Sequence, residues 1–327
     1  MDNSRKQGRN KGLLTSILEA IGETPLVELS RLTRRLEGRI LAKLENLNPG
    51  YSKKDRIALQ IIEDAISAGT LKSGQPVVEV TSGNTGTGLA IVCAIKRHPF
   101  VAVMSKGNSI ERAKMMSALG AEVVLVDQLP GSLPGEVSGG DLALVEEASR
   151  EIAEQRGAFR ADQFRHQSNF LAHYLHTGPE ILGQSNNAVD AFCDFVGTGG
   201  TFAGCAAAFK ESDSSIQCFV VEPEEAALLS GEKVTNPNHS IQGGGYALSD
   251  LALLNPKHID GFIKVSDEAA IAAARRLAKE EGIFAGFSTG ANLAAALHLL
   301  ENSVPGKTIA IVVCDSGLKY LSTKLWP

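Results

Sequence analysis

The chain has 327 residues, of which 43% are apolar and 21% charged, a composition typical of a folded globular protein. The formal net charge of −5 argues against the generally basic surface that holds nucleic acid or an anionic membrane. No apolar run approaches the ~20 residues of a membrane-spanning helix, and the polar, basic residues 1–11 lack the apolar segment of a secretory signal. We therefore expect a cytoplasmic protein with no nucleic-acid or membrane partner.

Short apolar runs rich in β-branched residues alternate with helical patterns along the chain. In chain order, the predicted strands are residues 39–44, 77–80, 100–104, 122–126, 191–196, 217–221, 261–264 and 308–313. The predicted helices include residues 56–68, 86–96, 109–119, 142–155, 169–182, 200–210, 267–281 and 290–300. Continuous apolar strands separated by helices predict an α/β fold with twisted, mostly parallel sheets covered by helices. Several strands lead into glycine-rich turns that open a helix, which is where such sheets bind ligands.

The chain has five cysteines. An odd number without a Cys-x-x-Cys pair, mostly in apolar surroundings, predicts reduced and buried thiols rather than disulfides. Cys314 ends an apolar run and could border a site, although nothing marks it as a nucleophile. We expect no metal site.

The first candidate site is the segment Asn48–Arg56, in which a Pro-Gly turn leads into a predicted helix. Ser52 is a candidate N-cap, and Asp55 suits the first helical turn. A lysine is unfavourable there, because a helix N-terminus favours anions. A lysine that reacts as a free amine needs such a setting, since a lowered pKa supplies that amine. Taken alone, however, adjacent residues such as Lys53 and Lys54 are more often surface lysines.

Two further segments place hydroxyl groups and glycines between a predicted strand and a helix. Residues 81–86 (Thr-Ser-Gly-Asn-Thr-Gly) would form an anion site at a helix N-terminus, and the alternative is a simple capped turn. Residues 197–201 (Gly-Thr-Gly-Gly-Thr) are similar to a phosphate cradle. They do not form a Walker loop, and Phe202 replaces the third glycine of the dinucleotide fingerprint.

The fourth segment, Gly286–Gly290, has the Gly-x-Ser-x-Gly pattern of a hydrolase nucleophile elbow around Ser288. That interpretation needs a preceding strand and a downstream histidine. Residues 267–282 are instead predicted to be helical, and the only later histidine, His298, lies inside a predicted helix. A serine hydrolase is therefore disfavoured.

In this order and spacing, the four segments resemble the fold type II pyridoxal-phosphate-dependent enzymes, in the branch of cysteine synthase and cystathionine β-synthase. The resemblance covers nearly the whole chain. It includes residues 22–26, 118–123, 239–243 and 320–323.

Carried over to this sequence, the family pattern implies that Lys54 forms the Schiff base with pyridoxal 5'-phosphate, whereas Lys53 occupies a variable position. The cofactor's ring hydroxyl would contact Asn84, its pyridine nitrogen Ser288, and its phosphate Gly197, Thr198, Gly199, Gly200 and Thr201. The substrate carboxylate would be held by Thr81, Ser82, Thr85 and Gln163. Gly243 lies in the family's substrate-facing glycine stretch.

The resemblance implies β-replacement on an activated serine or on cysteine. A neutral serine at the pyridine nitrogen makes a weaker electron sink than an aspartate, which favours prompt loss of a β-leaving group. Lys54 is placed to remove the α-proton. An aminoacrylate intermediate would follow, and synthesis of cysteine from O-acetylserine and sulfide is the leading assignment.

Several alternatives stay open. They are a β-eliminating lyase (a cysteine desulfhydrase or a serine/threonine dehydratase) and a synthase of cystathionine, lanthionine or diaminopropionate-type products. A non-catalytic binding module is disfavoured, because both Lys54 and Ser288 are present.

The resemblance also implies two α/β domains, as in the tryptophan synthase β-like fold, with the cofactor in the cleft between them. Residues 1–47 would join the large domain, residues 48–162 would form the smaller domain, and residues 163–327 the large cofactor-binding domain. The chain would act as a homodimer on a small amino acid and a small nucleophile.

The sequence departs from the family pattern in three places. Tyr51 stands where a small residue is usual, so it could narrow the site or hydrogen-bond a substrate, or it could simply point to solvent. Residues 242–246 differ after their first glycine. Residues 128–140, with two prolines, four glycines and two serines, predict a surface loop longer than usual. These departures leave the nucleophile and the leaving group undetermined.

Overall fold

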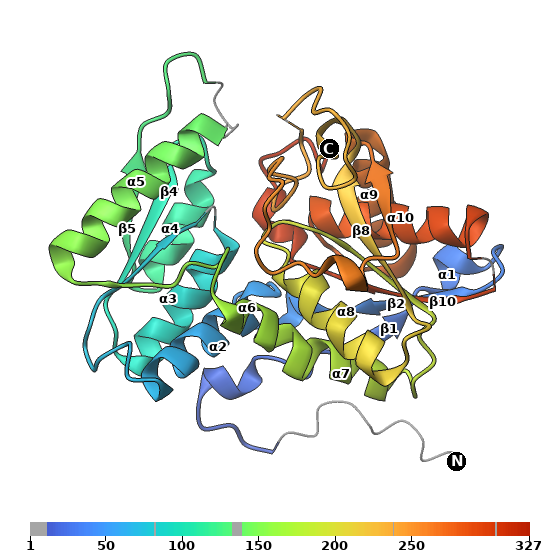
Figure 1. Ribbon diagram of the computed structural model, residues 1–327, viewed down its shortest axis with the longest axis horizontal. Helices are drawn as coiled ribbons and strands as arrows, with labels where there is room; N and C mark the ends of the chain where they lie inside the picture. The colour runs from blue at the N-terminus through green and yellow to red at the C-terminus, as the bar shows by residue number, and fades with distance from the viewer. Residues whose placement is uncertain (1–11, 82, 133–138, 238, 305) are drawn as a thin grey trace.

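The computed structural model describes residues 12–81, 83–132, 139–237, 239–304 and 306–327. They form two mostly parallel β-sheets, each with helices on both faces, and the two sheets lie side by side (Figure 1). The predicted α/β class with helix-covered parallel sheets is confirmed. Among the described residues, no helix is both long and apolar enough to span a bilayer.

The larger sheet combines strands from both ends of the chain. In spatial order it contains β1 (Leu26–Glu28), β2 (Arg39–Lys43), β10 (Thr308–Val312), β7 (Ala191–Phe195), β8 (Gln217–Pro223) and β9 (Gly261–Val265). Only the short edge strand β1 pairs antiparallel with its neighbour. The strand from the C-terminal region, β10, therefore lies between β2 and β7.

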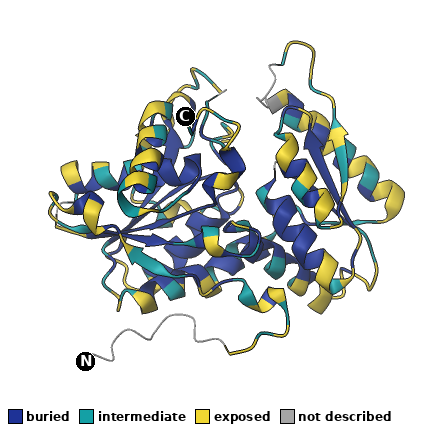
Figure 2. Ribbon diagram, turned by 180° about the vertical axis from the view of Figure 1, so that it is seen from behind, coloured by how far each residue is buried: buried dark blue, intermediate teal, exposed yellow. Residues whose placement is uncertain are grey.

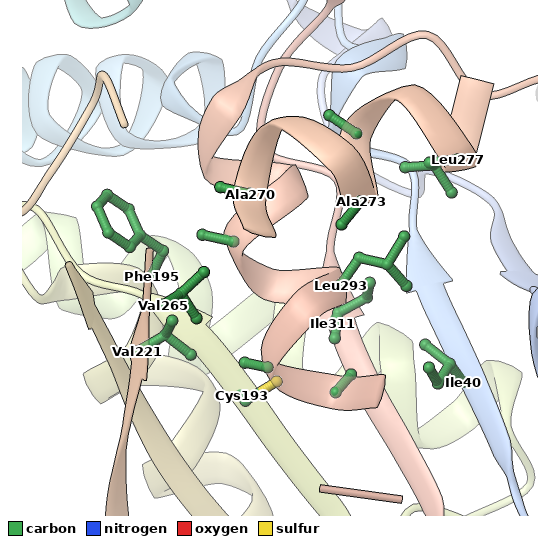
Figure 3. Packing of buried hydrophobic residues seen from close by; sticks show 14 of the residues in the cluster. Ile40, Cys193, Phe195, Val221, Val265, Ala270, Ala273, Leu277, Leu293 and Ile311 are labelled. Atoms are coloured by element: carbon green, nitrogen blue, oxygen red, sulfur yellow. The ribbon is translucent and has the colours of Figure 1, made fainter. Parts of the chain in front are cut away.

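Helices cover both faces of this sheet because its strands are apolar on both sides. One face packs against α1 (Ser30–Thr33), α9 (Asp267–Glu281) and α10 (Phe287–Asn302). Figure 3 shows part of this packing, in which Leu293 of α10 lies beside Ile311 of β10 and Ala273 of α9. The other face packs against α7 (Gly178–Gln184) and α8 (Gly200–Ser212).

The smaller sheet is entirely parallel. Its spatial order is β5 (Glu122–Val126), β4 (Phe100–Ser105), β3 (Val77–Val80) and β6 (Phe159–Arg160). Side chains alternate along β3, so that Val77 packs in the cluster that includes α2 and α3, whereas Val78 packs in the cluster that includes α5. The helices are α2 (Lys54–Ser67), α3 (Asn84–Lys96), α4 (Ile110–Ala118) and α5 (Gly139–Arg156).

The helix predicted over residues 169–182 is interrupted. It consists of α6 (Gln167–Ala172), a π-helical turn η3 (His173–Thr177) and α7. The cause is Pro179 in the first turn of α7, because proline has no backbone N–H and clashes with the preceding turn of a helix. The N–H of Gly178 bonds to the carbonyl of His173 instead, which closes the wider turn.

Other elements differ from the prediction mainly at their ends. The cap of α2 is Lys53 rather than Ser52, although the Ser52 hydroxyl accepts a hydrogen bond of 3.3 Å from the Lys54 N–H. Helices α3 and α10 begin two and three residues earlier than predicted. Sequence patterns missed α1, β1 and β6, which are too short to show a period. The 3-10 turns are η1 (Ile17–Ala20), η2 (Glu45–Leu47), η4 (Glu224–Ala226), η5 (Pro256–His258) and η6 (Gly317–Tyr320).

Figure 2 shows that the central strands are buried, while exposed positions follow the outer sides of the helices and also occur on strands such as β5 and β9. All five cysteines are buried and free, as predicted. Within the predicted loop 128–140, residues 133–138 lie outside the described part of the chain. The domain boundaries at residues 48 and 163 stay a prediction.

Candidate active site

The turns that open α2, α8 and α10 meet beside the segment that follows β10. The N–H of Lys53 bonds to the carbonyl of Cys314 at 2.9 Å, and the N–H of Ser316 bonds to the carbonyl of Tyr51 at 3.1 Å. The N–H of Gly286, which caps α10, bonds to the carbonyl of Asp315 at 3.3 Å. Residues 314–316 thus hold the lysine segment and the start of α10 against each other.

A pocket lies where these turns meet. It is lined by Lys53, Lys54, Asp194, Phe195, Val196, Gly197, Thr198, Gly199, Thr201, Gly243 and Ser288. The pocket gathers Lys54, Gly243, Ser288 and most of the predicted phosphate cradle. A Cβ added at Gly243 would lie 4.0 Å from Ser288 Oγ, so these two residues face each other.

The cradle needs its glycines for close approach. Gly199 caps α8 with a φ of 83°, in the left-handed region. A Cβ at Gly197 would lie 2.5 Å from the carbonyl oxygen of Gly243, and one at Gly200 would lie 2.1 Å from Asn169 Oδ1. The first N–H groups of a helix have no partner within it, so this loop can donate backbone hydrogen bonds to an anion.

The two cradle hydroxyls are held from the interrupted helix. Asn169 Nδ2 donates to Thr198 Oγ1 at 2.9 Å and to the carbonyl of Gln163 at 2.7 Å. His173 Nε2 lies 3.2 Å from Thr201 Oγ1. Burial and the nearby charge of Lys53 hold the pKa of His173 well below its usual value, so the ring stays neutral. The π-turn at His173 therefore serves the site, and no sequence pattern indicated it.

The two lysines of the pocket have opposite electrostatic environments. Lys53 Nζ lies 3.1 and 3.0 Å from the two carboxylate oxygens of Asp194. Burial alone would lower the pKa of Lys53, but the Asp194 charge outweighs it and the net shift is upward. The pKa of Lys54 falls to about 8 because of burial and the charge of Lys53. Lys54 is therefore the lysine with a readily available free amine.

Of the residues predicted to hold a substrate carboxylate, Thr81 and Thr85 lie at the N-terminus of α3 and Gln163 follows β6, and none of these three belongs to the pocket lining. Thr81 Oγ1 accepts the N–H groups of Gly83 and Gly86 at 3.1 and 2.8 Å. Thr85 Oγ1 donates to Gln163 Oε1 at 2.7 Å. Ser82 lies outside the described residues.

Helix α3 is nevertheless close to the lysine. A Cβ added at Gly88 would lie 3.0 Å from the carbonyl oxygen of Lys54. Asn84, at the start of α3, has its amide fixed from the segment after β10. Its Nδ2 donates to Asp315 Oδ2 at 2.7 Å, and its Oδ1 accepts from Lys319 Nζ at 2.6 Å. Asp315 also accepts the Tyr320 hydroxyl at 2.6 Å.

Sequence reasoning missed Asp194, Asp315 and Lys319. One signal was present for Asp194, because it is the only charged residue in the apolar run 191–196 and a buried charge needs a partner. Asp315 and Lys319 had no comparable signal. Tyr51 is 48% exposed and is not among the pocket-lining residues. Its φ of 62° is unusual for a residue other than glycine.

Comparison with known proteins identifies the family to which the chain belongs. The model of the family described as "Pyridoxal-phosphate dependent enzyme" matches residues 17–315. The chain belongs to this family of pyridoxal-phosphate-dependent enzymes. It is similar to a protein named cysteine synthase from Staphylococcus aureus, with 41% identity over 312 residues that cover 95% of this chain and 96% of that one.

Solved structures that are similar to this chain support the same family assignment. A hydrogen sulfide-producing enzyme from Fusobacterium nucleatum has a TM-score of 0.85 and 39% identity, covering 94% of this chain and all of that one. An O-acetylserine sulfhydrylase isoform from Entamoeba histolytica has a TM-score of 0.87 and 35% identity, covering 98% of this chain and 93% of that one. The enzyme thus has the predicted fold and cofactor dependence, and it acts at the β-carbon of an amino acid.

The pocket fits pyridoxal phosphate chemically. The cofactor needs a site for a dianionic phosphate, an amine for its aldehyde and a partner for its ring nitrogen. The glycine cradle with Thr198 and Thr201, the Lys54 amine and the Ser288 hydroxyl supply these groups around one pocket. In the described part of the chain, no cluster of three His, Cys, Asp or Glu side chains is suited to a metal ion.

The cradle can be tested by Gly199→Ala. The new Cβ would lie 3.0 Å from Leu254 Cγ, and an L-residue at this φ costs roughly 1–2 kcal/mol. We expect a lower thermal midpoint and an affinity for pyridoxal phosphate reduced by about tenfold or more, since 1.4 kcal/mol corresponds to tenfold. Fluorescence titration with the cofactor measures the affinity. Gly183→Ala is the matched control, because an added Cβ there meets nothing within 4 Å. Equal affinities in the two variants would remove Gly199 from the site.

Proposed function

We propose that this enzyme makes cysteine from O-acetylserine and sulfide by β-replacement. The observation that carries the proposal is the single pocket that joins the lowered-pKa amine of Lys54 to a glycine phosphate cradle and to Ser288. The similarity to the S. aureus cysteine synthase over nearly the full length of both chains supports the same reaction.

The proposed roles are those that the family pattern implies for this sequence, and the position of Lys54, the cradle and Ser288 around one pocket supports them. Lys54 binds the cofactor aldehyde, and Asn84 and Ser288 contact its ring hydroxyl and nitrogen. Residues 197–201 bind its phosphate. The substrate carboxylate is held by Thr81, Ser82 and Thr85 near the N-terminus of α3, together with Gln163, which accepts a hydrogen bond from Thr85. Gly243 faces the substrate from the side of Ser288.

When bound, pyridoxal phosphate withdraws electrons from the substrate α-carbon and so labilises its proton and the β-leaving group. The chain must then move that proton. Lys54 Nζ, with a pKa of about 8, can accept it near neutral pH and return it afterwards. Ser288 offers a neutral hydroxyl that adds no charge at the ring nitrogen.

β-Elimination is the second candidate function, because the F. nucleatum relative is named for producing hydrogen sulfide. A substrate panel separates the two functions. Serine, O-acetylserine, O-phosphoserine and cysteine are each supplied with and without sulfide, a thiol amino acid and an amine. Cysteine formed from O-acetylserine plus sulfide at the highest kcat/KM supports the proposal. Pyruvate or sulfide release as the dominant reaction would replace it by the lyase.

We further propose a cytoplasmic homodimer with the two domains bounded at residues 48 and 163. The free, buried cysteines support a reducing compartment. Light scattering of the purified enzyme tests the oligomeric state.

The role of the Tyr51 hydroxyl can be tested by comparing Tyr51→Phe with the wild type. If its hydroxyl binds the second substrate, the variant should lose about tenfold or more in the rate with one nucleophile relative to another, since an unpaired polar partner discriminates strongly. Tyr51→Gly is less informative, because glycine also relieves the positive φ. The measurement compares rates of the second half-reaction for sulfide, a thiol amino acid and an amine. Identical rate ratios would leave Tyr51 as a solvent-facing residue.

A further inference from the structure

Two lysine amines that are adjacent in sequence line the same pocket. Lys53 and Lys54 both belong to its lining, and so does Asp194 from the end of β7. Both lysines therefore border the candidate cofactor site, and the chemistry must distinguish their amines. The proposed function uses only Lys54.

The Asp194 carboxylate is fixed toward Lys53. Its ion pair with Lys53 spans 3.0 Å, and both side chains are at most 10% exposed. Asn292 Nδ2 donates to Asp194 Oδ1 at 3.0 Å and to the carbonyl of Val312 at 2.9 Å. Asn292 Oδ1 accepts the N–H of Phe195 at 2.6 Å. Asn292, which is itself buried on α10, therefore locks the carboxylate in place.

A second group that could become an anion near Lys53, the Cys314 thiol, does not replace Asp194. Cys314 Sγ lies 3.9 Å from Asp194 Oδ1. Burial raises the pKa of this thiol to about 11, so it is uncharged near neutral pH. The anion that faces Lys53 is therefore the Asp194 carboxylate.

We propose that Asp194 decides which of the two lysines binds the cofactor, by holding Lys53 as an ammonium ion and leaving Lys54 as the reactive amine. This inference rests on the proposed role of Lys54. Asp194 acts through Lys53 and is a positioning residue.

The chemistry requires this distinction. In Schiff-base formation, the amine lone pair adds to the aldehyde carbon, and the aldehyde oxygen leaves as water after it gains two protons. An ammonium ion has no lone pair and cannot add. The charge of Lys53 also disfavours a second positive charge on its neighbour, which adds to the effect of burial on Lys54.

Removing the Asp194 carboxylate should lower the pKa of Lys53 and so favour its neutral amine. A buried ammonium ion without a counter-ion is costly, and such lysines respond by releasing their proton. Each unit by which the pKa falls raises the fraction of free amine about tenfold at a pH below that pKa. Asp194→Asn keeps the shape of the side chain and removes its charge.

The test measures how much pyridoxal phosphate becomes attached to Lys53 in a protein whose Lys54 is replaced by alanine. Purified Lys54→Ala and Lys54→Ala/Asp194→Asn proteins are incubated with pyridoxal phosphate, and any imine is fixed by borohydride, which adds hydride to the C=N carbon. Peptide mass spectrometry then locates the pyridoxyl group. We expect little label on Lys53 in the single variant and about a hundredfold more in the double variant. Lys54→Ala/Asp190→Asn is the matched control, because Asp190 pairs with the exposed Lys307 just before the same strand.

The outcomes separate this inference from the proposed function. Label on Lys53 in the wild type would overturn the role of Lys54 and this inference together. Label on Lys54 in the wild type, with no gain at Lys53 in a folded double variant, would overturn only the role of Asp194. If the double variant does not fold, Asp194→Asn alone is mapped, and we expect a share of the label to move to Lys53. Label confined to Lys54 in that variant would count against the inference.

Discussion

Replacing Lys54 by alanine should lower the rate of β-replacement by about a thousandfold or more, because one side chain supplies both the amine for the cofactor and the acceptor for the α-proton. The absorbance of the lysine-bound cofactor should disappear at the same time. Single-turnover kinetics with O-acetylserine and an absorbance spectrum of the purified protein measure the two effects.

Lys53→Ala is the control for this prediction. It should keep the absorbance of the bound cofactor, because Lys53 is paired with Asp194 and does not carry the aldehyde. The loss of its charge should raise the pKa of Lys54, since the neighbouring charge contributes to lowering that pKa. If Lys53→Ala abolishes the absorbance and Lys54→Ala keeps it, the assignment is wrong by one residue.

The second large effect concerns stability. Arg56 of α2 donates to both carboxylate oxygens of Glu45 at 2.7 Å and to Glu180 at 2.6 Å, while Lys43 pairs with Glu180 at 2.6 Å. Arg56→Met should lower the free energy of unfolding by about 3–5 kcal/mol, because it leaves Glu45 buried without its partner. Urea unfolding measures the change. Arg150→Met, which breaks an exposed pair with Glu147, should cost less than about 1 kcal/mol.

The same variant predicts a pH dependence. Burial would raise the pKa of Glu45, but Arg56 outweighs it and lowers the pKa from 4.5 to about 2. This stabilisation is present above pH 4.5 and is lost as the pH falls through about 2. Without Arg56, burial should raise the pKa of Glu45. The carboxylate would then be protonated at a higher pH, which removes the cost of burying its unpaired charge. The stability difference should therefore shrink between pH 7 and about pH 3, and a constant difference would show that Glu45 is not responsible.

The sequence was sufficient for the fold class and for the segments that surround the pocket, because both depend on local patterns. Short, mostly apolar runs such as residues 77–80, bounded by turns and alternating with helical patterns, indicate buried parallel strands, and glycine turns between strand and helix indicate close backbone approach. The functional assignment of those segments needed their combined order, since each one alone had an ordinary structural explanation.

The features that sequence patterns missed depend on contacts between distant residues. The pairing of Lys53 with Asp194 joins residues 141 positions apart, and the contact of Lys319 with Asn84 joins residues 235 positions apart. The π-turn at His173 follows from Pro179, yet a proline in a helical pattern predicts only an interruption and not its geometry. The helix ends were misplaced because glycine, serine and threonine suit a first helical turn as well as a loop.

The central position of β10 has a consequence for synthesis of the chain on the ribosome. The smaller sheet uses residues 77–160 and can pair as soon as that stretch emerges. The larger sheet cannot join β2 to β7 until residues 308–312 appear, so both strands keep an open edge until that segment has been synthesised. Residues 314–316, which anchor the lysine segment, emerge later still. A nascent chain stalled before this point would be exposed to aggregation and unable to hold its cofactor, so the active site forms only after residues 314–316 have emerged.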